Sequence, residues 1–235
     1  MNILALDTAT TLLSVALGTG NGTFSFEIDA GQRHSELLMD VTEQVIKIAG
    51  LHPGDIELVA CMKGPGSFTG LRIGFAAAKG LALSLGIPML AIPTLDCIAA
   101  SYRTWPGIVL PVIDAKKHRY FIALYRRNER LSPFMDADPL TIADTIAANM
   151  RDDPLFLTGP DAHILLPELC PLVPVKRLYL DPLRRKGRGI ELLTIAKNTN
   201  LANHSQDIFS GPEYLRQSDA ELSFSNRRPD KNSPQ

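Results

Sequence analysis

The sequence ILALDTATTLLSVAL at residues 3–17 decides the fold, because VLPVIDAKKHRYFIAL at residues 109–124 repeats its pattern. Each stretch is an apolar run that ends in an aspartate, followed by a polar turn and a second apolar run, which predicts a β-hairpin. Asp7 and Asp114 take the same place in the two hairpins, at a constant offset of 107 residues. An internal duplication explains this agreement, since two unrelated hairpins would seldom carry an aspartate at the same turn.

The duplication predicts an α/β protein with two related halves, each opening with its hairpin. We place the first half at residues 1–105, a smaller and more diverged second half at 106–225, and a polar tail that we expect to be disordered at 226–235. In nucleotide-binding proteins of such a fold, the two aspartates face the phosphates and the metal between the halves. Asp7 and Asp114 are therefore candidate nucleotide ligands, although an aspartate at a hairpin turn is also a good turn residue.

A glycine-rich turn, GPGSFTG at residues 64–70, leads into a long apolar segment. A strand-to-helix turn of this kind can present free N–H groups and a partial positive charge to a phosphate. The Walker pattern is absent, because Leu71 and Arg72 follow the last glycine, and Thr69 stands where a dinucleotide loop has its third glycine. A structural turn and a phosphate site are both open interpretations. The candidates for a vestigial nucleotide site are Asp7, Thr8, Gly66, Ser67 and Asp114.

Two predicted helices carry more apolar surface than one buried face requires. The helix predicted from about residue 69 to 85 is apolar around almost its whole circumference. The helix predicted at Arg33–Ala49 has one apolar face and a second, partly separate apolar stripe. Such helices need cover on several sides, which can come from the core of their own chain or from a partner protein.

Composition and sequence pattern argue against a secreted protein and against a membrane protein. The chain has 235 residues, 45% of them hydrophobic, and a net charge of −1, which is ordinary for a globular protein. With no secretory signal or membrane span in the sequence, we expect a cytoplasmic protein without a membrane partner. The basic segment at residues 176–188 is expected to be a solvated loop rather than a nucleic-acid patch.

No catalytic group or metal site is predicted. The three cysteines lack metal-ligand spacing, and His34 has Leu38 one turn later in place of a second ligand, so His34 is expected to face solvent at a helix start. Ser67 is not in the setting of a hydrolase nucleophile. The sequence brings no base, nucleophile and electrophile together, so no catalytic residue is assigned.

The sequence resembles the TsaB (YeaZ) family in ILALDTAT with SVAL, RHSELLM, GPGSFTGLRIG with KGLAL, and IDAKKHRY. The resemblance is close in the N-terminal half and looser beyond it. It implies an actin-like, sugar-kinase-like fold (ASKHA, ribonuclease H-like) with two related halves. It also implies a non-catalytic subunit of the bacterial machinery that makes threonylcarbamoyladenosine beside the anticodon of tRNAs reading ANN codons.

The resemblance implies specific partners. In that machinery the related subunit TsaD carries the metal and transfers the threonylcarbamoyl group. TsaE is an ATPase that joins TsaB and TsaD. The TsaB-like chain contacts tRNA only indirectly, through the complex. The first two helices of TsaB-like chains pack against TsaD as a heterodimer, and whether the chain alone forms a homodimer through the same helices stays open. No tightly bound cofactor is expected, and ATP with Mg²⁺ would be a weak or vestigial ligand. Carried onto this chain, the candidate partner-binding residues are Leu38, Met39, Val41, Val45, Leu71, Phe75 and Ala78.

Lys116 departs from the family, because relatives often carry Arg there, and the basic 176–188 segment is unusual as well. Two other functions stay open on the residues themselves. One is an ATP-binding small-molecule kinase or ATPase of the same fold, which would use Asp7, Asp114 and the glycine turn. The other is a zinc peptidase, which would require bound metal in the purified protein.

Overall fold

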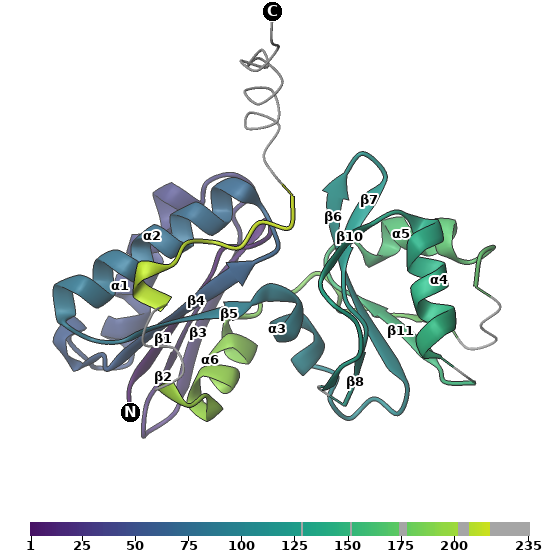
Figure 1. Ribbon diagram of the computed structural model, residues 1–235. Helices are drawn as coiled ribbons and strands as arrows, with labels where there is room; N and C mark the ends of the chain where they lie inside the picture. Colours follow the sequence, from purple (N-terminus) through teal and green to yellow (C-terminus); the bar gives the residue numbers. More distant parts are fainter. Residues whose placement is uncertain (128, 151, 174–177, 202–206, 217–235) are drawn as a thin grey trace, which may run out of the picture.

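The computed structural model describes residues 1–127, 129–150, 152–173, 178–201 and 207–216, and it shows two α/β halves side by side (Figure 1). The first half contains a five-stranded sheet whose first two strands along the chain are buried along their whole length. This burial explains why their sequences read as continuous apolar runs. Its elements are β1 (Ile3–Asp7), β2 (Leu12–Gly18), β3 (Thr23–Asp29), α1 (His34–Ile48), η1 (Pro53–Asp55), β4 (Leu58–Gly64), α2 (Phe68–Leu85), β5 (Met89–Pro93) and α3 (Thr94–Ala100).

The second half repeats this plan, with most elements shorter and with an added two-stranded ribbon, β8–β9. Helices α4 and α5 pack with its sheet around a separate apolar core. The last helix and a short 3-10 turn follow the final strand. The elements are β6 (Ile108–Lys116), β7 (Arg119–Ile122), β8 (Tyr125–Arg126), β9 (Glu129–Arg130), β10 (Met135–Ala137), α4 (Pro139–Asn149), β11 (Leu155–Thr158), α5 (Ala162–Leu169), β12 (Leu178–Leu180), α6 (Gly189–Asn198) and η3 (Asp207–Phe209).

The two sheets have the same topology. The first has the strand order β3-β2-β1-β4-β5, and the main path of the second has the order β10-β7-β6-β11-β12. In each, the opening strand pairs antiparallel with the second strand of its hairpin and parallel with the fourth. The predicted duplication is confirmed, and the fold is the actin-like, sugar-kinase-like α/β fold.

The final helix of each half packs across onto the other half. In α3, Leu95 and Ile98 bury against strands of the second half, whereas Leu192 and Leu193 of α6 bury against the first sheet. The predicted division at residues 1–105 and 106–225 is therefore corrected, because α6 and the segment 207–216 lie on the first half. The predicted tail at 226–235 lies outside the described residues.

Leu193→Ala tests this exchange of helices. Leu193 is 2% exposed, and truncating such a core leucine should lower the free energy of unfolding by about 3 kcal/mol. Ile190 on the same helix is 44% exposed, so Ile190→Ala is the matched control and should cost less than about 1 kcal/mol. Urea denaturation measures both, and equal losses would contradict the docking of α6 on the first sheet.

Candidate functional site

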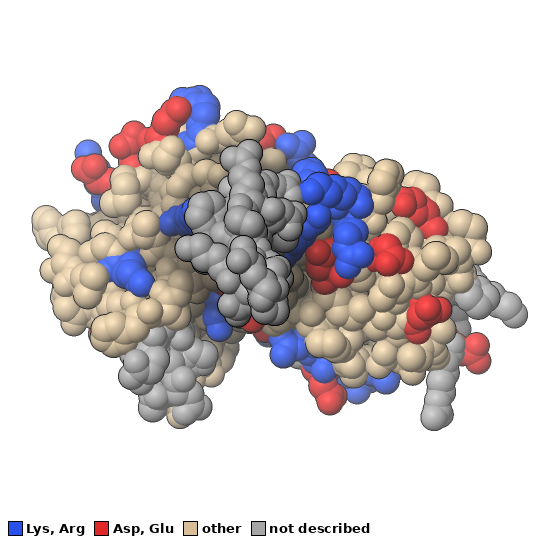
Figure 2. All heavy atoms as spheres, turned by 45° about the horizontal axis from the view of Figure 1, so that its top comes forward, with Lys and Arg blue, Asp and Glu red and all other residues tan. Residues whose placement is uncertain are grey.

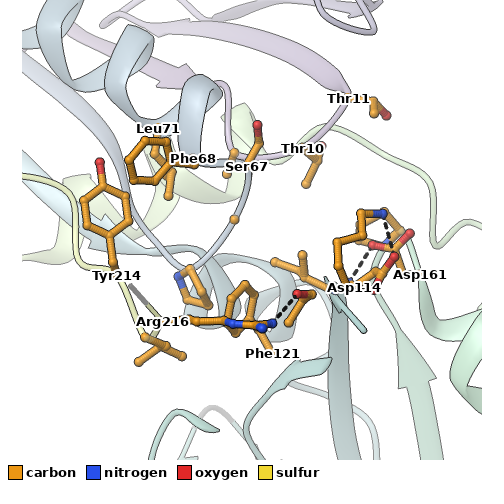
Figure 3. A pocket seen from close by; sticks show the side chains of 18 of the residues that line it. Thr10, Thr11, Ser67, Phe68, Leu71, Asp114, Phe121, Asp161, Tyr214 and Arg216 are labelled. Carbon is orange, nitrogen blue, oxygen red and sulfur yellow. Dashed lines mark hydrogen bonds and ion pairs between the residues drawn. The ribbon is translucent and has the colours of Figure 1, made fainter. Parts of the chain in front are cut away.

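A cleft of about 660 Å³ lies between the two halves (Figure 3). The β1–β2 turn and the start of α2 form its wall on one side, and β6, β7 and the loop before α5 form the other. Residues 213–216 of the C-terminal segment complete it. The side chains labelled in Figure 3 are Thr10, Thr11, Ser67, Phe68, Leu71, Asp114, Phe121, Asp161, Tyr214 and Arg216.

Asp7 is turned away from this cleft. Its side chain is buried, with 2% exposure, and it is not among the residues that line the cleft. One carboxylate oxygen accepts the N–H of Ala9 at 3.0 Å, and the other accepts the N–H of Arg188 at 2.8 Å. Burial raises the pKa of Asp7 to about 6, against the lowering effect of these two donors. The carboxylate therefore links the end of β1 to the start of α6.

The glycine turn packs tightly against the turn that follows β1. The Thr8 hydroxyl is buried and donates to the carbonyl oxygen of Gly70 at 2.8 Å. A Cβ at Gly70 would lie 2.1 Å from the Thr8 carbonyl oxygen, and one at Gly66 would lie 2.5 Å from that of Ala9. Both glycines are required for this close approach, so the packing supports the structural interpretation of the turn. Ser67 reaches the cleft and caps α2 by accepting the Gly70 N–H at 3.2 Å.

Asp114 does line the cleft, where its carboxylate is paired with Lys116 of its own hairpin. Its carboxylate lies 2.6 Å from Lys116 Nζ and also accepts the Lys116 N–H at 2.7 Å. The Asp114 N–H donates to Asp161 at 2.8 Å, and burial raises the pKa of Asp161. Figure 2 shows Lys and Arg side chains gathered where the two halves meet, and the basic residues lining the cleft are Lys116, Lys117 and Arg216.

The residues present do not fit a magnesium nucleotide. The structure brings Gly66, Ser67 and Asp114 together in the cleft but withdraws Asp7 and Thr8 into the core. A carboxylate that already accepts two backbone N–H groups and is closed off from the cleft cannot also hold a hydrated cation there. No step through a nucleotide or a metal is derived for this site.

A buried polar cluster at the start of α6 was missed by the sequence analysis. The Arg188 guanidinium is 3% exposed and donates to the Ser101 hydroxyl at 2.7 Å. Ser101 in turn donates to Glu191 at 2.7 Å, and Lys186 Nζ lies 2.8 Å from the same carboxylate. The expectation of a solvated loop over 176–188 is wrong at Arg188, while residues 176 and 177 lie outside the described residues.

The sequence did contain a signal for this close approach. Glycines flank Arg188, and a Cβ at Gly187 would lie 2.5 Å from the Cβ of Ser14 on β2. His34 is a second correction, because it is 4% exposed at the start of α1 instead of facing solvent. Burial lowers the pKa of His34, which keeps the ring neutral at physiological pH.

The predicted partner-binding residues are mostly core residues. Only Met39 among the seven is well exposed, at 49%. The other six are 0–5% exposed and pack between the helices and the first sheet, so the proposed contact faces of α1 and α2 are corrected. A side chain without accessible surface cannot meet a partner. The six buried positions are Leu38, Val41, Val45, Leu71, Phe75 and Ala78.

The opposite faces of these helices are exposed. On α2, Ala76, Gly80 and Leu83 follow one another at helical spacing, and Leu83 is 66% exposed. On α1, Met39 and Ile48 are exposed, the latter at 60%. These exposed residues are accessible to another molecule, and of them only Met39 was selected from the sequence.

The fold and cleft define a two-lobed α/β protein of the actin-like class whose first-strand acid is withdrawn into the core. The family model of TsaD, described as tRNA N6-adenosine threonylcarbamoyltransferase, matches residues 28–154, and the chain belongs to this family. Within the described residues, no helix is long and apolar enough to cross a membrane. The same residues contain no group of three or more His, Cys, Asp or Glu placed to hold a metal.

Several similar proteins of known name are TsaB proteins, as the sequence resemblance indicated. The tRNA threonylcarbamoyladenosine biosynthesis protein TsaB of Bacillus subtilis (strain 168) is 29% identical over 227 residues, which cover 95% of this chain and 98% of that protein. TsaB of Escherichia coli (strain K12) is 38% identical over 134 residues, covering 55% of this chain and 57% of that protein. The similarity to TsaB is thus confirmed.

Solved structures agree with this fold. A crystal structure from Pseudomonas aeruginosa, described as an uncharacterized protein with similarity to peptidase YEAZ, has a TM-score of 0.75 and 26% identity, covering 92% of this chain and 99% of that one. YeaZ from Pseudomonas aeruginosa has a TM-score of 0.71 and 24% identity, covering 87% and 93%. The second likeness shows the fold alone.

The raised pKa of Asp7 predicts an unusual dependence of stability on pH. Below pH 4 the carboxyl is protonated in both the folded and unfolded chains. As pH rises from about 4 to 6, the unfolded chain releases this proton first, so the free energy of unfolding falls by about 3 kcal/mol. Asp7→Asn removes this titration. Denaturation between pH 4 and 7 should show the wild type losing stability relative to Asp7→Asn, and parallel profiles would contradict the assignment.

Proposed function

We propose that this chain is a non-catalytic partner subunit of a TsaD-type transferase. In this proposal it supports threonylcarbamoyl transfer to tRNAs reading ANN codons, in a cytoplasmic complex with TsaD-like and TsaE-like proteins. The names of its relatives place them in threonylcarbamoyladenosine biosynthesis. Because the chain matches the family model of TsaD, a TsaD-type partner would have a fold related to that of this chain.

The observation that carries the proposal is the withdrawal of Asp7 from the cleft. Its carboxylate accepts the N–H groups of Ala9 and Arg188. The acid that was expected to bind a metal and phosphates therefore stabilises the fold instead. The cleft retains Asp114, but Lys116 neutralises it. A chain with this arrangement contributes to a reaction through surfaces that it presents to other proteins.

The exposed face of α2 supports a helical partner. Gly80 lies inside the helix, where glycine is destabilising by about 1 kcal/mol relative to alanine. A Cβ at Gly80 would meet nothing within 4 Å in this chain, so intramolecular packing does not require the glycine. With Ala76 one turn before and Leu83 one turn after, it forms a shallow strip on which the backbone of another helix can approach closely.

The exposed side chains of α1 can supply anchors beside this strip. Met39 and Ile48 present flexible apolar groups, and methionine adapts well to irregular partner surfaces. Between them, α1 exposes Asp40, Glu43 and Lys47, which can select a partner through charge. The same surface can serve a homodimer when the transferase is absent.

Gly80→Trp tests the proposed surface. The indole should block the close approach and weaken binding to a co-expressed TsaD-type subunit about 30-fold or more, since a central interface substitution costs ~2 kcal/mol or more. Gly80→Ala is the matched control, because it should keep binding and raise the stability of the isolated chain by up to about 1 kcal/mol. Surface plasmon resonance and thermal unfolding provide the two readouts.

Leu140→Trp on α4 controls for the exposure of a tryptophan elsewhere, because Leu140 is 64% exposed on the second half. It should leave the affinity for the transferase unchanged. Wild-type affinity of the Gly80→Trp variant would refute the surface, and equal loss in Leu140→Trp would show that the effect is not local.

Calorimetric titration with ATP and Mg²⁺ separates the proposal from a kinase or ATPase. We expect no heat of binding at micromolar nucleotide, because Asp7 is closed off from the cleft. Tight binding by the isolated chain that disappears in Asp114→Ala would establish a nucleotide site instead. Zinc analysis of the same purified sample tests the peptidase alternative.

A further inference from the structure

The described C-terminal segment runs along the outside of α2 and reaches the cleft between the halves (Figure 1). It starts at η3, where Ile208 packs against the core of the first half. It ends with Tyr214, Leu215 and Arg216 in the wall of the cleft. The segment therefore connects the far side of the first half to the boundary with the second.

Several contacts fasten this segment to the first half. Lys79 Nζ on α2 donates to the carbonyl oxygen of Ser210 at 2.8 Å. The Glu213 N–H donates to the carbonyl oxygen of Lys63 at 2.7 Å, and the two side chains form an ion pair at 3.4 Å. A Cβ at Gly64 would lie 2.4 Å from the Glu213 carbonyl oxygen, so the glycine makes room for the segment.

Tyr214 is held by aromatic and cationic groups at the start of α2. Its ring lies 4.8 Å from the ring of Phe68, centroid to centroid, and its hydroxyl accepts from Arg72 Nε at 3.0 Å. The Arg72 guanidinium lies 3.7 Å above the Phe68 ring, which completes a stacked group. Figure 3 shows Tyr214 and Phe68 on the first-half side of the cleft.

Arg216 then crosses to the second half. Its Nη1 donates to the carbonyl oxygen of Ala115 on β6 at 3.2 Å. In Figure 3 the Arg216 side chain extends past Phe121, which also belongs to the second half. A segment fastened to α2 and β4 at one end is thereby bonded to the opposite wall of the cleft at the other.

We infer that residues 210–216 form a clasp that holds the two halves at one fixed degree of closure. Two-lobed folds close by hinge motion around a ligand, whose contacts to both lobes select the closed state. In this chain a segment of the polypeptide makes contacts to both lobes. The clasp therefore replaces the bridging action of a cleft ligand, and it does so whether or not the chain is a transferase partner.

The test measures the distance between the halves. Cys170 in the second half is exposed, while Cys61 and Cys97 are buried, so Cys170 can be spin-labelled together with Asn21→Cys in the first half. Double electron–electron resonance spectroscopy then gives the distance distribution between the two spin labels. The full chain and a chain ending after Arg216 should both give one narrow distribution. A chain ending after Ser210, which loses residues 211–216 of the clasp and keeps Ile208, should give a distribution about twofold broader.

Full-length Tyr214→Ala/Arg216→Ala is the second variant and removes the clasp contacts without shortening the chain. It should broaden the distribution in the same way, while circular dichroism confirms that both variants stay folded. Unchanged narrow distributions in a folded variant of either kind would overturn the clasp. If the shorter chain fails to fold, the full-length double variant alone decides: a broadened distribution supports the clasp and an unchanged one overturns it.

Discussion

The carboxylate of Asp7 is the interaction on which the rest of the arrangement depends. It ends the first strand, accepts the N–H groups of Ala9 and Arg188, and so ties the opening hairpin to the helix that returns from the second half. That return places α6 under the first sheet and brings the C-terminal segment along α2. Because of these two hydrogen bonds, the Asp7 carboxylate faces the core, whereas a nucleotide enzyme of this fold would be expected to direct this acid into its cleft. The architecture and the separation of Asp7 from the cleft thus share one cause.

The architecture could be predicted from the sequence because the hairpin pattern that opens each half occurs twice. The hairpins at 3–17 and 109–124 agree in pattern and in their aspartates, and the two sheets share one strand order. Local signals also sufficed to place the strand-to-helix turn at residues 64–70, whereas the close approach of Gly66 and Gly70 to the backbone of Ala9 and Thr8 is visible only in the structure. Patterns of this kind depend on neighbours along the chain, which a sequence displays directly.

The exposed face of α2 could not be predicted because the helix is apolar on nearly every side. Periodicity cannot say whether Phe75 or Leu83 faces inward when both are large and apolar, and the structure buries the first and exposes the second. Arg188 and His34 were misjudged for a related reason, since polar side chains are expected outside unless a partner distant in sequence receives them. The exchange of α3 and α6 between the halves also rests on packing that no local pattern encodes.

Reconstitution of tRNA modification tests the central claim most directly. Purified TsaD-type and TsaE-type subunits would be given threonylcarbamoyl-adenylate, ATP and a tRNA reading ANN codons, with or without this chain. The account predicts that threonylcarbamoyladenosine forms only when the chain is present, that the chain alone forms none, and that Asp114→Ala supports the reaction as well as wild type. Full modification without the chain, or transfer by the chain alone, would contradict the account.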